Sequence, residues 1–282
     1  MLVEGYSEMK KFLPAIEMKG EPTIFDEALA AAQERLVRLI IGDQLETQLE
    51  QRAAADHKLL LHCQRVISQD AFLESIPDLD LILTDAGFAV VNNEKVTMAS
   101  RDRVDSLKKG TEDKLQASRD ALIAYLLRTT AYNSWRLTEE FEVFASALVT
   151  TYEEFKMVAI LTNASAKSYP QSWNEFHALL PAMNTALMTD VASYISKEYA
   201  IELIGKIRER TQMSPAEKAV FLIIQRAATS YAMEDRAVGQ QLATRAYSLM
   251  QKDLDSFPTF AASAEAKDIA LQHADTPIFS MF

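Results

Sequence analysis

The sequence predicts a mostly α-helical protein built as a tandem of two related helical units, with a small β hairpin or meander inserted in the first unit. The composition favours helix, because the 282 residues include only 7 Gly and 8 Pro and little interrupts a helical hydrogen-bond ladder. The 49% hydrophobic content is sufficient for real cores. A repeated order of motifs predicts the tandem, and a run of strand-forming residues predicts the insertion.

The repeat begins with YSEMKKF at 6–12 and YEEFKMV at 152–158. Each phrase precedes a loop with Pro and then a stretch in which large apolar residues recur near helical spacing. In the first half these residues are Phe25, Leu29, Leu36, Leu39, Ile40 and Leu45, and in the second Phe176, Leu180, Leu187, Val191 and Ile195. We therefore expect one long amphipathic helix after each phrase.

A further helix follows in each half, at 57–69 and at 216–232. Both carry Lys, an apolar run and then Gln-Arg, and Ser214 is a candidate N-cap for the second. Another helix closes each half, at 101–127 and 237–254. Because gaps are needed to align the halves, chance similarity between two helical segments stays open beside duplication.

The expected organisation is a first unit at 1–132, a connecting helix at 133–150 capped by Thr138, and a second unit at 151–282. The β insertion is expected at about 78–98. Its apolar runs flank Asp85-Ala86-Gly87 and Asn92-Asn93, which are typical turn sequences. An isolated hairpin is marginal in water, so we expect it to pack on its own helices or on a neighbour.

Charge and cysteine content exclude several classes of protein. The net charge is −11 and no basic stripe is visible, which argues against sequence-specific binding of nucleic acid. Cys63 is the only cysteine, so an intramolecular disulfide and a multi-cysteine zinc site are excluded. Without a signal peptide or an apolar run of about 20 residues, we expect a soluble, intracellular chain with no membrane contact.

No residues stand out as catalytic, cofactor-binding or metal-binding. His57 and His62 are five apart, which places them on different faces of a helix, and Cys63 is best explained as a small buried hydrophobe. The acidic clusters at 139–142 and 153–154 fall in first helical turns, where the helix dipole stabilises negative charge. The sequence therefore predicts a protein that is not an enzyme and needs no cofactor.

The C-terminal sequence PIFSMF is strongly apolar, and large apolar side chains there would be unfavourable if they were exposed to solvent. Its large apolar residues are Ile278, Phe279, Met281 and Phe282. Two interpretations remain open. The tail could fold back on its own core, or it could insert into a neighbouring subunit.

The run LDLILTDAGFAVVNNEKVTMASRDRVDSL and the later SWNEFHALLPAMNTALMTDVASYI resemble a family of head-tail connector proteins, also called portal-adaptor or ring proteins, from phages and prophages of gut bacteria. The resemblance covers most of the chain. It implies a structural virion protein, synthesised and assembled in the host bacterial cytoplasm, that forms a ring, often twelve-fold, in the DNA conduit. Its partners would be the portal protein and neighbouring tail or ring proteins, and DNA would pass without sequence-specific binding.

The same resemblance assigns roles to two segments. The tail residues Ile278, Phe279, Met281 and Phe282 would dock onto a partner, in this family commonly the portal. The hairpin would contact the next ring through Phe88, Val90, Asn92 and Asn93.

Two alternatives come from other classes of protein. One is a helical scaffold or regulatory protein that binds a cellular protein in a groove between the two units. The other is an enzyme whose dispersed site would form a deep pocket with converging titratable groups.

Overall fold

The computed structural model describes residues 1–13, 23–79, 82–84, 87–89, 101–160 and 169–266. The chain is mostly α-helical and divides into two compact units, Met1–Glu142 and Val143–Phe282. The division falls inside the segment 133–150, where the sequence predicts the connection. Each unit is described by itself below.

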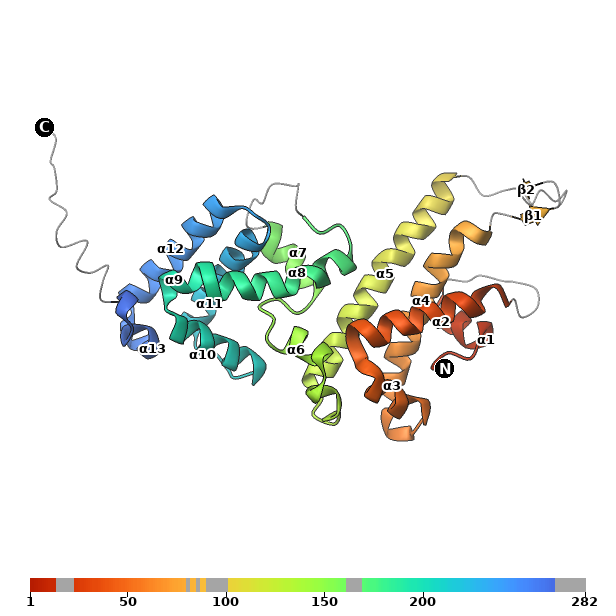
Figure 1. Cartoon of the computed structure of the whole chain (residues 1–282), viewed down its shortest axis with the longest axis horizontal. Coiled ribbons are helices and arrows are strands. Elements are labelled where there is room, and N and C mark those ends of the chain that lie inside the picture. Colours follow the sequence, from red (N-terminus) through yellow and green to blue (C-terminus); the bar gives the residue numbers. More distant parts are fainter. Residues whose placement is uncertain (14–22, 80–81, 85–86, 90–100, 161–168, 267–282) are drawn as a thin grey trace, which may run out of the picture. The chain divides into compact units, whose positions relative to one another are not determined.

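The first unit is a set of helices with one pair of short strands (Figure 1). Its elements, in chain order, are α1 (Tyr6–Met9), η1 (Lys10–Phe12), η2 (Thr23–Phe25), α2 (Asp26–Leu36), the π-helical turn η3 (Val37–Ile41), α3 (Gly42–Glu50), η4 (Ala54–Asp56), α4 (His57–Leu79), β1 (Ile82–Thr84), β2 (Gly87–Ala89), α5 (Arg101–Arg128), η5 (Trp135–Leu137) and the start of α6 (Glu139–Ala145).

The strands β1 and β2 pair antiparallel in the region where the sequence predicts the insertion, with Leu83 opposite Phe88 and Thr84 opposite Gly87. The strand that a meander would add after Asn92-Asn93, at 96–98, falls outside the described residues. Val90, Asn92 and Asn93, which the resemblance assigns to a contact with the next ring, also lie outside them.

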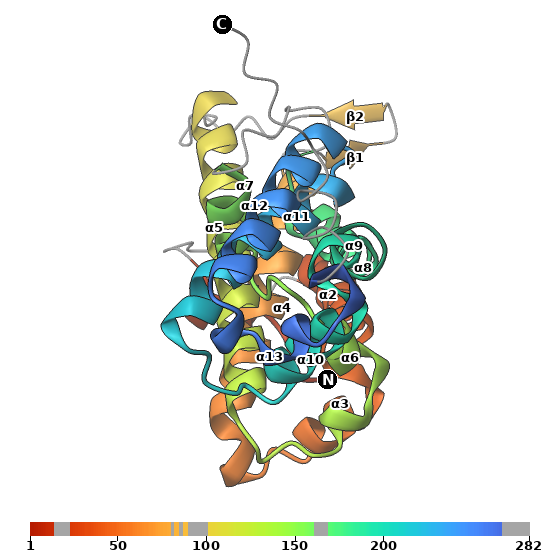
Figure 2. The same cartoon turned by 90° about the vertical axis from the view of Figure 1, so that its left-hand side faces the viewer.

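The second unit begins with the end of α6. Its further elements are α7 (Tyr152–Ile160), α8 (Trp173–Ala186), the π-helical turn η7 (Leu187–Val191), α9 (Ala192–Ile195), α10 (Lys197–Arg208), α11 (Pro215–Ala232), α12 (Arg236–Lys252), η8 (Leu254–Ser256) and α13 (Pro258–Ala261). Helix α11 packs against α7, α8 and α12, and α11 and α12 lie side by side in Figure 2.

The core of the first unit forms where α2 and α5 pack on α4. An ion-pair network joins these three helices, because the carboxylate of Asp70 accepts hydrogen bonds from Arg35 Nε at 3.0 Å and from Arg119 Nη2 at 3.2 Å. Burial lowers the pKa of Arg119, and the negative charge of Asp70 opposes that effect. The pairing keeps the buried guanidinium compensated.

The core of the second unit centres on α11. Tyr152 and Phe155 of α7 and Phe176 of α8 form an aromatic cluster, with ring centroids 5.3 to 6.2 Å apart. Helices α11 and α12 approach closely at Gly239, where a Cβ atom would lie 2.8 Å from the Tyr231 ring. A side chain at position 239 would displace that ring.

In the first unit, the opening segment (residues 2–9) is held by side chains that bind its backbone. Gln64 Nε2 of α4 donates a buried hydrogen bond to the Leu2 carbonyl at 2.9 Å. The Glu4 N–H donates to Glu8 Oε2 at 2.9 Å, across the first turn. Leu2 is fully buried, so the glutamine supplies a partner for a carbonyl that water cannot reach.

The opening segment of the second unit (residues 148–155) makes the same contacts. Gln225 Nε2 of α11 donates to the Leu148 carbonyl at 2.6 Å. The Thr150 N–H donates to Glu154 Oε2 at 3.0 Å. Leu148 is also buried. In each unit, therefore, a glutamine from a later helix, α4 or α11, binds the carbonyl that lies two residues before the Glu-capped N–H.

The expectation of one long helix in each half is wrong. The first long helix passes through η3 and breaks at Gly42 (φ 70°, ψ 161°), and the second passes through η7 and α9 and breaks at Ser196 (φ 71°, ψ 151°). These backbone angles are incompatible with a continuing helix, and position 42 is glycine because only glycine adopts them without strain. At position 196 the Ser Oγ accepts a hydrogen bond from the Tyr199 N–H at 3.2 Å and so caps α10.

The expected connecting helix at 133–150 is also shorter than predicted. Helix α6 ends at Ala145, and residues 133–138 form a turn around η5. The expected cap is present, because Thr138 Oγ1 accepts from the Phe141 N–H at 3.2 Å. Trp135 is fully buried and donates to the Ile40 carbonyl at 2.7 Å, so this segment belongs to the core of the first unit.

We expect Gly42→Ala to destabilise the first unit by about 1–3 kcal/mol, because alanine is strained at a φ of 70°. Its Cβ would also lie 2.9 Å from Glu140 Oε2. Chemical denaturation measures the effect. Gly110→Ala is the matched control: Gly110 lies inside α5 with open space around it, so alanine there should stabilise by about 0.5–1 kcal/mol. Equal effects at the two positions would contradict the role given to the break.

Candidate partner-binding pocket

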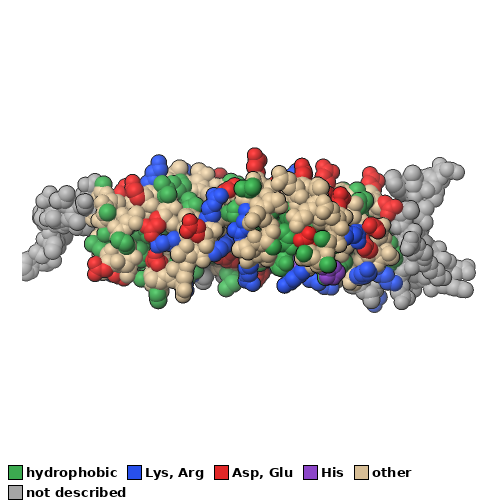
Figure 3. Space-filling view, turned by 90° about the horizontal axis from the view of Figure 1, so that it is seen from below, with side chains coloured by type: hydrophobic (Ala, Val, Ile, Leu, Met, Phe, Trp, Pro, Cys, Tyr) green, Lys and Arg blue, Asp and Glu red, His purple; other side chains and the backbone are tan. Residues whose placement is uncertain are grey.

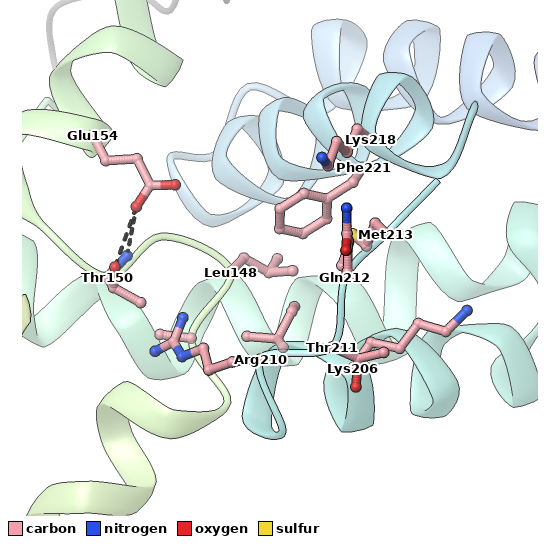
Figure 4. Close-up of a pocket in the computed structure, with 12 residues that line it drawn as sticks. Leu148, Thr150, Glu154, Lys206, Arg210, Thr211, Gln212, Met213, Lys218 and Phe221 are labelled. Atoms are coloured by element: carbon pink, nitrogen blue, oxygen red, sulfur yellow. Dashed lines mark hydrogen bonds between the residues drawn. The ribbon is translucent and has the colours of Figure 1, made fainter. Parts of the chain in front are cut away.

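The second unit contains a cavity of about 350 Å³ between its opening segment, α10 and α11 (Figure 4). Ala147, Leu148 and Thr150 line it from the segment before α7, and Glu154 from α7 itself. Its other lining residues, from the end of α10 to the second turn of α11, are Lys206, Ile207, Arg210, Thr211, Gln212, Met213, Lys218 and Phe221.

One wall of the cavity is a hydrogen-bonded group around Glu154. Its Oε2 accepts from the N–H and the hydroxyl of Thr150, at 3.0 and 3.3 Å, as the dashed lines in Figure 4 show. Its Oε1 accepts from Gln225 Nε2 at 3.1 Å, and the same amide donates to the Leu148 carbonyl. This wall is therefore built by the contacts that close the unit.

Ion pairs of Lys206 stabilise the side of the cavity formed by α10 and the start of α11. Lys206 Nζ contacts Glu202 Oε1 at 2.5 Å and also bonds to Glu217, and its side chain extends away from the cavity in Figure 4. Partial burial lowers the pKa of Lys206, but the two carboxylates outweigh this and raise it overall. Burial likewise raises the pKa of Glu217, but the bonds from Lys206 and Ser214 lower it below its ordinary value. Glu217 and Ser214 form a capping box that starts α11.

Arg210 and Lys218 add positive charge to a largely apolar cavity. Leu148 and Phe221 face its interior in Figure 4, with Met213 beside them. Apolar walls with a few cations suit a ligand that presents both a hydrophobic side chain and a carboxylate. The same lining also carries the carboxylate of Glu154.

The first unit has an arginine in the corresponding place. Arg52 and Arg210 both follow the helix after the break, and both have a left-handed backbone, with φ 51° and 55°. Arg52 contacts Glu4 Oε1 at 3.0 Å and Glu8 Oε1 at 3.1 Å. Its guanidinium therefore bridges two carboxylates of the opening segment. In the second unit the residue that corresponds to Glu4 is Thr150, which has no carboxylate.

Of the contact residues that the sequence predicts, only Phe88 belongs to the part of the chain that the structure describes. Ile278, Phe279, Met281 and Phe282 lie outside the described residues, and Phe88 belongs to β2 of the first unit.

Burial and ring packing account for two other titratable residues that the sequence analysis considers, Cys63 and His62. Cys63 is buried, which raises the pKa of its thiol. His62 stacks on Tyr125 at 5.2 Å, and burial with the nearby Arg65 and Lys58 lowers its pKa. No group of His, Cys, Asp and Glu suited to a metal ion occurs among the residues that the structure describes.

Sequence reasoning missed Arg210, Lys218 and Phe221. The available signal was a longer alignment of the two halves. LVEGYSE at 2–8 corresponds to LVTTYEE at 148–154, and this pairing places Thr150 where the first half has Glu4. The change of an acid to a threonine in an otherwise similar phrase indicates a local difference between the units.

On the face drawn in Figure 3, acidic and basic side chains are interspersed with hydrophobic ones. A single-sign field does not extend over that face.

Comparison with known families matches residues 20–145 to a family described as a family of unknown function (DUF6712). The match covers less than half of the chain and falls almost wholly in the first unit. Neither the curated proteins nor the solved structures include a match. Among the described residues, no helix is long and apolar enough to cross a bilayer.

We expect Gln225→Leu to destabilise the second unit by about 1–3 kcal/mol, because the buried Leu148 carbonyl loses its partner. Denaturation followed by fluorescence of Trp173, which is buried in this unit, reports the effect. Gln240→Leu is the control, since Gln240 is exposed on α12 and the change should stay within about 0.5 kcal/mol. If Gln225→Leu lowers the unfolding free energy no more than Gln240→Leu does, the bond from Gln225 to the Leu148 carbonyl does not stabilise the unit.

We expect Lys206→Met to destabilise the second unit by about 1 kcal/mol at neutral pH. The lowered pKa of Glu217 and of Glu202 means that their stabilising effect is present above pH 4.5, their ordinary value, and is lost as the pH falls through the lowered values. The variant should therefore lose less stability than the wild type when the pH falls below 4.5. Parallel curves of unfolding free energy against pH would contradict this pairing.

Proposed function

We propose that this protein is a structural virion protein, a head-tail connector subunit that acts through ring assembly rather than through catalysis. The observation that carries the proposal is that each unit is closed by its own buried contacts yet exposes large apolar side chains. Leu61 and Leu222, each three residues before the glutamine that closes its unit, are 36% and 49% exposed. Met157 and Ile201 of the second unit are 63% and 54% exposed. Covering such side chains with a partner removes apolar surface from water.

The matching contacts support a further part of the proposal, that the two units arose by duplication of one helical module. The glutamine-to-carbonyl bond, the Glu-capped N–H and the left-handed arginine recur in the same order along the chain. A repeated helical module offers two similar surfaces for contacts with neighbours, as repeat proteins do.

Within this proposal the subunits form a ring, twelve-fold by resemblance, below the portal. The excess of acidic residues favours a conduit that does not retain DNA, since negative charge repels phosphates. The hairpin residues Phe88, Val90, Asn92 and Asn93 would contact the next ring. The helical scaffold or regulatory protein remains the alternative.

Removal of residues 277–282 should abolish assembly and leave helix content unchanged, because the proposal assigns Ile278, Phe279, Met281 and Phe282 to a partner contact. Light scattering measures the mass of the full-length and shortened proteins, alone and with a portal protein encoded nearby, and circular dichroism measures helix content. Replacement of Gln240, a polar residue exposed on α12, by Ala is the control and should leave assembly intact.

Rings of normal mass from the shortened protein would overturn the role of the tail. A full-length protein that stays monomeric or dimeric with any portal would favour the scaffold alternative.

A further inference from the structure

We infer that copies of this chain join through two surfaces of the first unit, so that the turn at 137–139 of one copy docks on helix α4 of the next. In this contact the Leu137 side chain packs against Leu61, and the Glu139 carboxylate binds the Arg65 guanidinium. The inference rests on the proposed function, which requires contacts between copies. It deepens that proposal by naming the two surfaces that meet.

The receiving surface is the exposed face of α4, called here the α4 patch, which consists of Lys58, Leu61, His62 and Arg65. These positions recur at intervals of three and four residues, so they lie on one side of the helix. Leu61 is 36% exposed, and the two cations are exposed on either side of it. The α4 patch therefore offers an apolar centre with a positive charge one helical turn away in each direction.

Aromatic rings lie under the charges of the α4 patch. Lys58 Nζ is 5.0 Å from the centroid of the Tyr125 ring, on which His62 also stacks. Arg65 Cζ is 5.9 Å from the centroid of the Phe12 ring. Among the described residues, neither Lys58 nor Arg65 pairs with a carboxylate. In a protein with a net charge of −11, such a face suits a partner that presents an anionic side chain.

The docking surface of the other copy is the turn before α6. Leu137 is 87% exposed, the largest exposed fraction among the large apolar side chains that the structure describes. Glu139 is exposed at the start of α6. Because the backbone of Thr138 is extended (φ −95°, ψ 160°), the α-carbons of Leu137 and Glu139 lie about 6–7 Å apart. The turn therefore places one apolar and one negative side chain close together.

The two surfaces match in spacing as well as in charge. Leu61 and Arg65 are four residues apart on a helix, which puts their Cβ atoms about 5–6 Å apart. An arginine guanidinium that lies over a ring still presents its N–H groups at the edge, where a carboxylate can accept two of them. One copy can therefore pair Leu137 with Leu61 and Glu139 with Arg65 at the same time.

The contact requires a second copy, because within one chain Leu137 is left almost wholly in solvent. Its turn packs on α3 through η5, whereas α4 packs against α5 and η1 (Figure 1). A contact between two different surfaces is head-to-tail, so each copy keeps one surface available for the next copy. Repeated contacts of this kind close into rings when the rotation between copies permits it.

The second unit supplies a matched control surface. Leu222 of α11 corresponds to Leu61, since each stands three residues before the glutamine that closes its unit. Leu222 is also exposed, but Ala219 stands where the α4 patch has Lys58. This helix face therefore keeps the apolar residue and lacks one of the charges.

The test is disulfide trapping between full-length chains that each carry one introduced cysteine, with an affinity tag on one of the two chains. Leu137→Cys mixed with Leu61→Cys should form a covalent mixed dimer under mild oxidation at least about tenfold faster than Leu137→Cys mixed with Leu222→Cys. Cys63 is buried and should not compete. Equal rates in the two mixtures would overturn the inference.

The ion pair has its own test. Arg65→Glu in the Leu61→Cys chain should slow trapping at least about fivefold, and Glu139→Arg in the Leu137→Cys chain should then restore it. Such a charge exchange reports the pairing itself rather than the folding of either variant. If Arg65→Glu leaves the rate unchanged, the Glu139 carboxylate does not bind there and the inference fails.

Light scattering of the unmodified protein distinguishes the failure of this inference from the failure of the proposed function. A protein that traps but never exceeds the mass of a dimer keeps the contact and loses the ring. A ring whose chains do not trap keeps the proposed function and loses the contact. Duplex DNA is the competing occupant of the α4 patch: absent trapping, together with weaker binding of a labelled duplex by Arg65→Glu, would assign the patch to phosphate and overturn the inference.

Discussion

The bond between a glutamine side chain and a buried backbone carbonyl is the interaction on which each unit of this protein depends. The opening segment of each unit enters the core, where its Leu carbonyl would otherwise lack a partner. Gln64 and Gln225 supply that partner from the helix that forms the centre of the unit. Because the bond is long-range in sequence, it fixes the opening segment only when the central helix is already in place.

Other features of each unit follow from this closure. Glu8 of α1 and Glu154 of α7 each accept a hydrogen bond from a backbone N–H of the opening segment. In the second unit the Gln225 amide also donates to Glu154. Arg52 and Arg210, whose backbones are left-handed, follow α3 and α10. Arg52 contacts Glu8, and Arg210 lines the same cavity as Glu154. In the first unit the arginine is neutralised by two carboxylates, whereas in the second unit Thr150 replaces one of them and a cavity remains beside it.

The fold class and the motif order were predictable from composition and apolar periodicity, since both depend on local properties. The cap at Thr138, the capping box at Ser214 and the Gln-Arg pairs stand where the sequence predicts them. The breaks at Gly42 and Ser196 were not predicted. Apolar spacing continues through each break, because the helices on both sides bury residues in the same core, and periodicity alone therefore reports one helix.

The sequence by itself determined a helical chain in two similar halves, because helix propensity, caps and apolar spacing act within a few residues of one another. Only the tertiary structure decided where the halves bend and which side chains line the cavity. Leu148 meets Arg210 and Phe221 there, although they lie 62 and 73 residues further along the chain. Such a meeting depends on how α7, α10 and α11 pack, and packing is a property of the whole unit rather than of any one segment.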